Sequence, residues 1–192
     1  MIVLVDYGMG NLGSVVKACR RLGVSINIVS TPKEINLADK IILPGVGNFS
    51  EGVKNLEPLR KVLTKKALVD KIPILGICLG MQLLGEVSEE GTGKGLGWIK
   101  GKNVKFNVDL KVPHVGWNSV KIVKDSPVSI PGNYYFAHSY HLICQEDDVL
   151  MTTKYGIEFV SAVQKDNIYG VQFHPEKSHK QGLKVLNKFL NV

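Results

Sequence analysis

Short apolar runs alternate with stretches of helical periodicity through the first half of this 192-residue chain. Nearly continuous hydrophobicity over four to six residues is typical of parallel strands that are covered on both faces. The periodic stretches between the runs predict helices that return the chain to the next strand. We assign strands to the apolar runs at residues 3–6, 40–43 and 72–75, and a further strand to residues 24–29, where apolar and polar residues alternate.

Two helices between these strands have clear end signals. The first is predicted to begin after Asn11, whose side chain can cap it, and to end before Gly23. Its apolar face includes Cys19, which is therefore expected in the core. The second is predicted to start at Pro58, a favourable first helical residue. Its buried stripe is Leu59, Val62, Leu63 and Leu68.

The pattern changes after the glycine-rich loop at residues 91–97, where alternation of period two predicts strands in hairpins. Lys165-Asp166-Asn167 is typical of a hairpin turn, and a last helix is expected from Ser178. The whole chain, residues 1–192, thus predicts one α/β domain with a mixed sheet and antiparallel strands in its C-terminal half. The strands lie near residues 98–106, 112–123, 134–136, 149–155, 159–164 and 168–173, and the last helix buries Leu183, Leu186, Phe189 and Leu190.

Composition limits the partners and the cellular compartment that we expect for this protein. The 24 basic and 17 acidic residues give a net charge of +7, but the lysines are scattered and no basic block is interleaved with aromatic residues, so we expect no nucleic-acid partner. The apolar run at the start is too short for a signal peptide or a membrane span. Three widely spaced cysteines favour neither a disulfide framework nor a zinc knuckle. We therefore expect a cytoplasmic protein without a membrane partner.

The clearest chemical motif is Gly76-Ile77-Cys78-Leu79-Gly80-Met81-Gln82, which follows an apolar run. Glycines two residues before and after Cys78 permit a tight strand-to-helix turn with the thiol at its apex. Unpaired N–H groups of the helix, beginning with that of Leu79, would favour a thiolate and an oxyanion beside it. Gln82 is four residues on and shares the helical face of Cys78. By itself, the motif also fits a buried cysteine in an ordinary glycine-rich turn.

A second glycine-rich loop, Pro44-Gly45-Val46-Gly47, follows the third predicted strand. Its glycines allow backbone N–H groups to turn toward a ligand, so it is a candidate oxyanion loop. It also fits a simple strand-to-helix turn. Ligands gather at the carboxyl ends of parallel strands, and this loop and Cys78 should therefore face the same crevice.

Phe173-His174-Pro175-Glu176 places a histidine and a carboxylate at the end of a predicted buried strand. Pro175 keeps the backbone extended, so the side chains of His174 and Glu176 should project to the same side. A lone histidine at a strand end is usually structural, but together with Cys78 the pair supplies a base and the group that orients it. The predicted chemistry is acyl transfer, with ammonia as the leaving group of a carboxamide.

These three motifs resemble those of the class I, triad-type glutamine amidotransferases, whose fold is a flavodoxin-like three-layer α/β sandwich with added antiparallel strands. Further stretches are similar to the glutaminase subunits of imidazole glycerol phosphate synthases, which act in histidine biosynthesis. The stretches are residues 6–11, 113–118, 135–140 and 175–178, and the similarity spans nearly the whole chain.

The resemblance implies a catalytic triad of Cys78, His174 and Glu176, with a thioester formed on Cys78. It implies no cofactor or metal, and a separate (βα)₈-barrel cyclase partner that receives the ammonia through an internal channel. By the same resemblance, glutamine and the oxyanion are held at Gly45, Val46, Gly47, Gln82, Glu90, Ser139 and Tyr140, and the partner interface includes Asn11, Trp117, Tyr135 and Lys177. From the residues alone, Trp117 fits core or interface equally well.

Other hypotheses remain at this point. A glutaminase serving another ammonia-using synthase shares the triad but lacks a stretch like residues 113–118. A peptidase-like hydrolase with a cysteine elbow lacks the His-Pro-Glu pair, and a regulatory binding module has no need of an intact triad. A metal site at His138 and His141 lacks a third ligand nearby.

Overall fold

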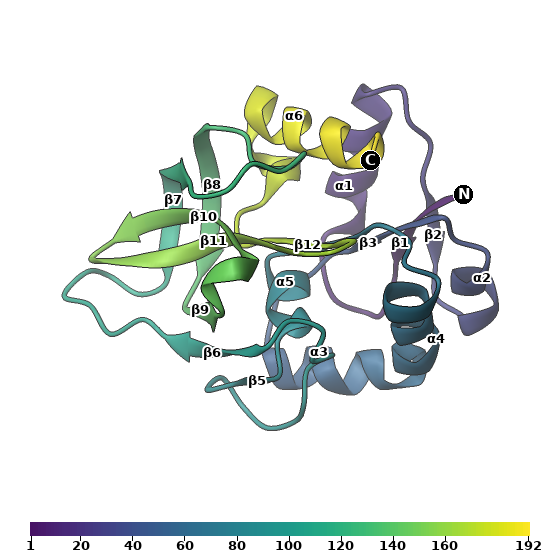
Figure 1. Ribbon diagram of the computed structural model, residues 1–192, viewed down its shortest axis with the longest axis horizontal. Helices are drawn as coiled ribbons and strands as arrows, with labels where there is room; N and C mark the ends of the chain where they lie inside the picture. Colours follow the sequence, from purple (N-terminus) through teal and green to yellow (C-terminus); the bar gives the residue numbers. More distant parts are fainter.

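A computed structural model describes all 192 residues, and a nine-stranded mixed sheet forms its centre (Figure 1). The strand order is β2-β1-β3-β4-β12-β11-β10-β7-β8, which makes β2 and β8 the edges. The parallel strands are β1 (Ile2–Val5), β2 (Asn27–Val29), β3 (Lys40–Leu43), β4 (Ile74–Ile77) and β12 (Ile168–Val171). The antiparallel part consists of β11 (Ile157–Lys165), β10 (Val149–Tyr155), β7 (His114–Ile122) and β8 (Gly132–His138).

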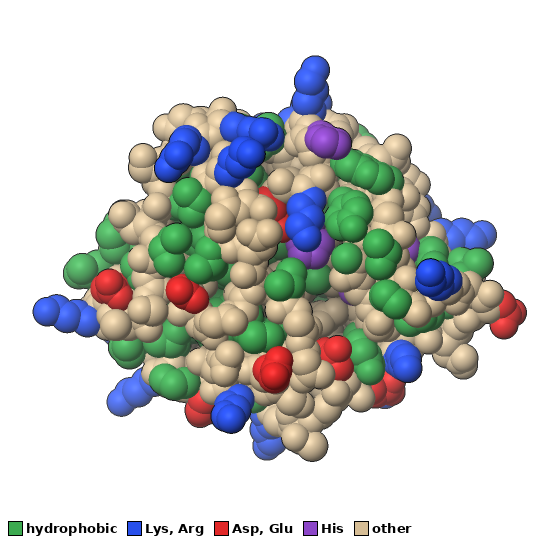
Figure 2. Space-filling model, turned by 180° about the vertical axis from the view of Figure 1, so that it is seen from behind, with side chains coloured by type: hydrophobic (Ala, Val, Ile, Leu, Met, Phe, Trp, Pro, Cys, Tyr) green, Lys and Arg blue, Asp and Glu red, His purple; other side chains and the backbone are tan.

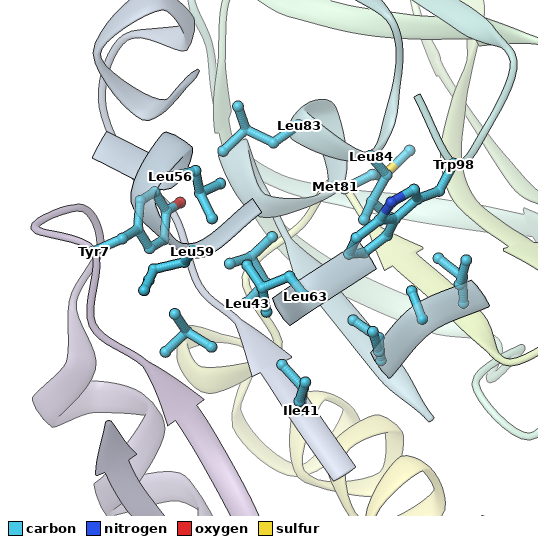
Figure 3. Packing of buried hydrophobic residues seen from close by; sticks show 14 of the residues in the cluster. Tyr7, Ile41, Leu43, Leu56, Leu59, Leu63, Met81, Leu83, Leu84 and Trp98 are labelled. Carbon is cyan, nitrogen blue, oxygen red and sulfur yellow. The ribbon is translucent and has the colours of Figure 1, made fainter. Parts of the chain in front are cut away.

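Helices cover both faces of the sheet and complete a three-layer sandwich (Figure 1). Along β3, Ile41 and Leu43 belong to one buried cluster while Ile42 belongs to the other, because successive side chains of a strand point to opposite faces. Figure 3 shows the packing of the first cluster. One face carries α1 (Leu12–Arg21) and α6 (His179–Leu190), and the other carries α3 (Phe49–Leu56), α4 (Arg60–Thr64) and α5 (Leu79–Leu84), with α2 (Pro32–Asn36) between β2 and β3 in the chain.

The end signals of α1 are confirmed. The Asn11 side chain accepts a hydrogen bond from the Ser14 N–H at 3.1 Å, which satisfies one of the free N–H groups of the first turn. Gly23 follows the helix with a φ of 74°, a left-handed conformation that glycine adopts without strain. Cys19 is fully buried in the core, as its place on the apolar face predicts.

The second predicted helix differs from the structure in its start and in its buried face. The helical segment begins at Phe49, where Asn48 caps α3, and passes through a 3₁₀ turn at Glu57–Leu59 into α4. It ends in a π-helical turn, Lys65–Val69, which takes one more residue per turn and rotates the side chains that follow. The expectation that Leu68 is buried is therefore wrong, because Leu68 is 49% exposed and Ala67 is buried in its place.

The second half of the chain also forms a small sheet that the sequence pattern did not predict. Its strands are β5 (Val87–Ser88), β6 (Gly101–Lys105) and β9 (Tyr140–Cys144), in the order β5-β6-β9. The strand predicted from Trp98 is shorter than expected, and the Trp98 side chain instead packs in the core. The turns of 3₁₀ type in this half are Glu146–Asp148 and Pro175–Lys177.

The surface agrees with the scattered basic charge seen in the sequence. On the face shown in Figure 2, Lys and Arg side chains are spread over the whole view, with hydrophobic, acidic and uncharged groups between them. None of the helices has both the length and the apolar character that a bilayer crossing requires.

Candidate active site

Cys78 occupies a strained turn between β4 and α5. Its φ of 53° and ψ of −110° lie outside the regions that ordinary residues prefer, which marks a position held by its surroundings. A Cβ atom on Gly80 would lie 2.0 Å from the Leu43 carbonyl oxygen, and one on Gly76 would lie 2.7 Å from the Gly80 carbonyl oxygen. The Gly-x-Cys-x-Gly spacing is thus a packing requirement of the elbow.

The order of the central strands brings the predicted loops together. β3, β4 and β12 are adjacent and parallel, so their carboxyl ends deliver the Pro44–Gly47 loop, Cys78 and His174 to one edge of the sheet. The loop packs directly on the elbow, since a Cβ on Gly45 would lie 2.6 Å from the Gly80 nitrogen. The Tyr7 hydroxyl donates to the Pro44 carbonyl at 2.6 Å and fixes the start of the loop.

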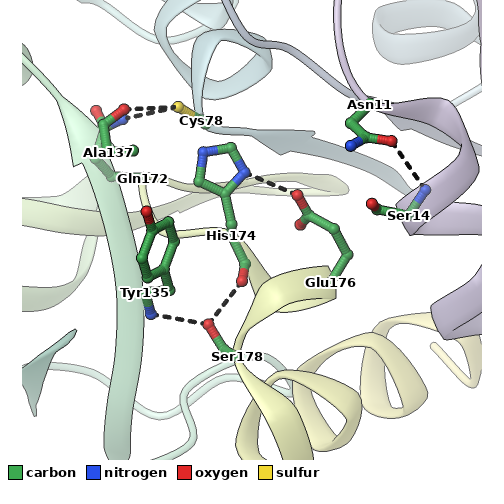
Figure 4. A network of polar contacts seen from close by, with 9 residues as sticks. All are labelled: Asn11, Ser14, Cys78, Tyr135, Ala137, Gln172, His174, Glu176 and Ser178. Atoms are coloured by element: carbon green, nitrogen blue, oxygen red, sulfur yellow. Dashed lines mark hydrogen bonds and ion pairs between the residues drawn. The ribbon is translucent and has the colours of Figure 1, made fainter. Parts of the chain in front are cut away.

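His174 and Glu176 form the pair that the motif predicts. The Nδ1 atom of His174 lies 2.8 Å from Glu176 Oε1, and the two side chains are only 2% and 3% exposed. Figure 4 shows the imidazole with Glu176 on one side and the Cys78 sulfur on the other. Burial opposes the charged ring, but Cys78 and Glu176 outweigh it and raise the pKa of His174 to about 9. The resting site therefore favours an imidazolium beside the sulfur.

Backbone contacts hold His174 to the edge strand β8. The His174 N–H donates to the Tyr135 carbonyl at 2.9 Å. The Ser178 hydroxyl donates to the His174 carbonyl at 2.6 Å and accepts from the Tyr135 N–H at 2.9 Å, as Figure 4 shows. Sequence reasoning placed Ser178 at the start of a helix and in the stretch 175–178 that carries the resemblance, but gave it no role toward His174. A hydroxyl residue four positions after the base was the available signal for this second role.

A cavity of about 180 Å³ opens beside Cys78. The structure brings most of the predicted site residues to its wall, whereas Gly45 lies beneath the elbow and Glu176 behind His174. Burial raises the pKa of Glu90, and the hydrogen bond from the Phe49 N–H, at 2.8 Å, opposes the shift. The lining consists of Val46, Gly47, Cys78, Leu79, Gln82, Glu90, Ala137, His138, Ser139, Tyr140, His174 and Lys177. Ala137 and His138 were not predicted as site residues, His138 having been considered only for a metal site that the sequence disfavours, and Lys177 was expected at the partner interface.

Comparison with known proteins agrees with this geometry. The family model for class-I glutamine amidotransferases matches residues 3–192. The chain belongs to the class-I glutamine amidotransferase family. Members of this family are enzymes, so this amidotransferase is an enzyme as predicted.

Two curated relatives are similar to this amidotransferase over essentially its full length. The imidazole glycerol phosphate synthase subunit HisH of Methanocaldococcus jannaschii is 50% identical over 197 residues, covering 100% of both chains. The subunit HisH 2 of Methanococcus maripaludis is 50% identical over 199 residues, covering 99% of this chain and 98% of the relative.

Solved structures support the fold at much lower identity. A crystal structure of a glutamine amidotransferase superposes with a TM-score of 0.80 at 18% identity, covering 100% of this chain and 98% of the other. The structure of PurLQS from Thermotoga maritima gives 0.78 at 19% identity, covering 99% and 97%. The α/β sandwich with a mixed central sheet, predicted from the sequence, is thereby confirmed.

A pair of buried histidines supports one wall of the amidotransferase cavity. His138 Nδ1 lies 2.8 Å from the Tyr140 carbonyl, and His138 Nε2 lies 3.2 Å from His114 Nδ1. Burial lowers the pKa of His138 to about 3 and that of His114 to about 4, so both rings are neutral. Both ring nitrogens of His138 already have protein partners, which argues against a metal ligand at this position. No group of three or more potential ligands lies close enough together to hold a metal ion.

The four residues predicted at a partner interface reach the surface near the active site. Trp117 is 49% exposed and stacks on His179 with ring centroids 5.1 Å apart, so it is not a core residue. The Trp117 and Tyr135 ring centroids are 6.2 Å apart, and Lys177 Nζ lies 5.8 Å from the centroid of Tyr135. Asn11 is exposed at the start of α1 and lies on the Glu176 side of the triad in Figure 4.

Proposed function

We propose that this amidotransferase is the glutaminase subunit of an imidazole glycerol phosphate synthase, which hydrolyses glutamine to glutamate and ammonia for histidine biosynthesis. The observation that carries the proposal is the buried Cys78, His174 and Glu176 arrangement in a chain 50% identical, end to end, to two HisH subunits. The size of the cavity supports an amino-acid substrate, since about 180 Å³ is less than drug-sized ligands generally occupy.

The triad performs acyl transfer in two steps. The Cys78 thiolate attacks the side-chain carboxamide carbon of glutamine, and the His174 imidazolium donates its proton to the departing ammonia, leaving a γ-glutamyl thioester. Neutral His174 then takes a proton from water as the water attacks the thioester, and glutamate and the thiolate are released. A pKa of His174 of about 9 keeps the proton available for the first step at neutral pH.

Backbone groups stabilise the oxyanion, and polar groups orient glutamine. We propose that the N–H of Leu79 and the backbone amides of the Gly45, Val46 and Gly47 loop donate hydrogen bonds to the oxyanion. The remaining wall holds the amino and carboxylate groups of the substrate. The groups assigned there are Gln82, Glu90 and the backbone at Gly47, Ser139 and Tyr140, with the Tyr140 carbonyl fixed by Gln82 Nε2 at 2.9 Å and His138 Nδ1 at 2.8 Å.

The ammonia passes to a cyclase partner, a (βα)₈ barrel, which docks on the surface around Asn11, Trp117, Tyr135 and Lys177. The partner combines ammonia with a phosphorylated ribulosyl aminoimidazole nucleotide, giving imidazole glycerol phosphate and aminoimidazole carboxamide ribotide. A 49%-exposed tryptophan beside a tyrosine and a lysine has the composition of an interface anchor. We infer that this loop, whose Val46 side chain is 38% exposed, completes the oxyanion hole only when the partner binds its nucleotide.

We place the complex in the cytoplasm because Cys19, Cys78 and Cys144 are all free thiols and catalysis needs a reduced Cys78. No cofactor takes part in the steps above. Each proton and electron pair they move is supplied by the triad, glutamine and water.

The test is ammonia release from glutamine by the purified chain, alone and with the cyclase and its nucleotide ligand, with Cys78→Ala as the blank. We expect a large rise on addition of partner and nucleotide that is absent in the blank. Strong release by the isolated chain would refute gating by the partner while keeping the glutaminase. Release that persists in Cys78→Ala would refute the triad, and cleavage of peptides in place of glutamine would support the peptidase-like hypothesis.

A further inference from the structure

A buried glutamine that the triad does not use lies against the catalytic sulfur. Gln172 is fully buried, two residues before His174, and its backbone N–H donates to Ser161 of β11 at 2.9 Å. Its side-chain Nε2 lies 3.7 Å from Cys78 Sγ, within hydrogen-bond range for sulfur (Figure 4). Burial of a polar amide is costly unless its donors and acceptor find partners, so the direction in which this amide points carries information.

The orientation of the Gln172 amide follows from its neighbours. The Tyr140 carbonyl can only accept, so the Gln82 group 2.9 Å away must be its NH₂. The same NH₂ lies 3.1 Å from Gln172 Oε1, which accepts the second proton. The amide of Gln172 therefore turns its own NH₂ toward the sulfur, and the reverse orientation would set two NH₂ groups against each other.

The other polar neighbour of the sulfur, the Ala137 carbonyl, favours the protonated thiol over the thiolate. The Ala137 carbonyl oxygen lies 4.0 Å from Cys78 Sγ and can accept only from the protonated thiol. The amide N–H of Gln172 instead stabilises the thiolate, because a donor interacts more strongly with a charged acceptor. His174, two residues further along the same segment, is the other donor to the sulfur. Gln172 is thus a second donor to the reacting atom.

We propose that Gln172 is a further catalytic residue, whose amide N–H donates to the Cys78 thiolate in the resting enzyme and again when the thiolate leaves the thioester. This inference rests on the glutaminase proposed above. Gln82 links the Gln172 amide to the Tyr140 carbonyl in the substrate-binding wall, which fixes the position of the Gln172 N–H. The amide therefore needs no reorganisation during the reaction.

The experiment measures alkylation of Cys78 by iodoacetamide as a function of pH, with peptide mapping to separate Cys78 from Cys19 and Cys144. Gln172→Met keeps the length of the side chain and removes the N–H, and Gln172→Asn keeps the amide but withdraws it by one methylene. The matched control is Gln164→Met on β11, where Gln164 pairs with Tyr169 at the opposite end of β12 from Cys78.

We expect the half-maximal alkylation pH of Gln172→Met to lie about one unit above wild type, a tenfold change in the thiolate equilibrium, with the same rate at high pH. Gln172→Asn should shift in the same direction, and it decides the question if thermal unfolding shows that Gln172→Met is not folded. Gln164→Met should match wild type. A merely structural role would change the KM for glutamine or the rate at every pH without moving the half-maximal pH.

Two negative results are distinguishable. Folded Gln172 variants with the wild-type half-maximal pH would overturn the inference while leaving the glutaminase intact. A wild-type Cys78 that alkylates no faster than Cys19 or Cys144 at neutral pH would instead contradict the proposed function itself, because no activated nucleophile would be present.

Discussion

Replacement of Glu176 by glutamine measures how much of kcat depends on the carboxylate that orients His174, compared with His174 itself. The carboxylate accepts from His174 Nδ1 at 2.8 Å in a site where the two side chains are 2% and 3% exposed. A hydrogen bond to a charged group contributes about 1.5–3 kcal/mol and a neutral one about 0.5–1.5 kcal/mol, so the substitution removes about 1–1.5 kcal/mol of imidazolium stabilisation. At about 1.4 kcal/mol per tenfold in rate, this predicts roughly a tenfold loss in kcat from the charge.

The orientation of the new amide adds to this loss. Glu176 Oε2 is buried without a hydrogen-bond partner, so no other group in the protein selects which way a glutamine amide at this position would turn. With its oxygen toward Nδ1 the ring keeps the required proton, and with its NH₂ toward Nδ1 the ring adopts the wrong tautomer. We therefore expect Glu176→Gln to lose about 10- to 100-fold in kcat, less than the 10²–10⁴-fold loss expected for His174→Ala.

The assay is the pH profile of glutaminase activity with the partner and its nucleotide present. Activity needs protonated His174, so it falls as the pH rises through the His174 pKa, about 9 in the native site. Loss of the carboxylate lowers this pKa, so the alkaline fall in activity should occur at a pH about one unit lower. Glu158→Gln, an exposed carboxylate on β11 that accepts from Thr152, should leave the profile unchanged. An alkaline limb that stays in place in Glu176→Gln, or a loss of kcat greater than that of His174→Ala, would refute the reasoning.

Three further substitutions test the elbow, the loop and the docking surface. Gly80→Ala places a Cβ 2.0 Å from the Leu43 carbonyl oxygen and should destabilise the protein by at least about 3 kcal/mol in urea unfolding, whereas a wild-type midpoint would disprove the packing requirement. Tyr7→Phe leaves the Pro44 carbonyl without its buried partner, which should cost about 1–2 kcal/mol of stability in the same assay and lower glutaminase activity. Trp117→Ala should weaken binding of the cyclase at least about tenfold in titration calorimetry with unchanged urea unfolding, and unaltered affinity would remove Trp117 from the interface.

The layered fold and the meeting of Cys78, His174 and Glu176 could be predicted because both depend on local patterns. The apolar run of β3 and the glycines around Cys78 are contiguous in sequence, and parallel-strand topology then places separate loops at one edge of the sheet. The cap at Asn11 and the turn at residues 165–167 are likewise short-range signals.

What the sequence could not show depends on tertiary contacts. Leu68 has the spacing of a buried helical residue, but the π turn at Lys65–Val69 rotates it to the surface. Strand β9 was missed because its mixed polar and apolar residues pair only with β6, 35 to 43 residues earlier in the chain. Gln172 sits within an apolar run, where only the positions of Gln82 and Cys78 in space reveal that its amide has partners.

The attachment of His174 to β8 makes the proposed catalytic base a reporter of events at the molecular surface. β8 is an edge strand, and its outer side is held by the bonds of Tyr135 to His174 and Ser178 in place of a neighbouring strand. The amide proton of His174 bonds to the Tyr135 carbonyl of this strand, and the aromatic ring of Tyr135 belongs to the proposed docking surface. The rate at which that single proton exchanges with deuterated solvent, followed by mass spectrometry or NMR, would therefore measure how strongly a docked partner restrains β8. This measurement needs no turnover of substrate.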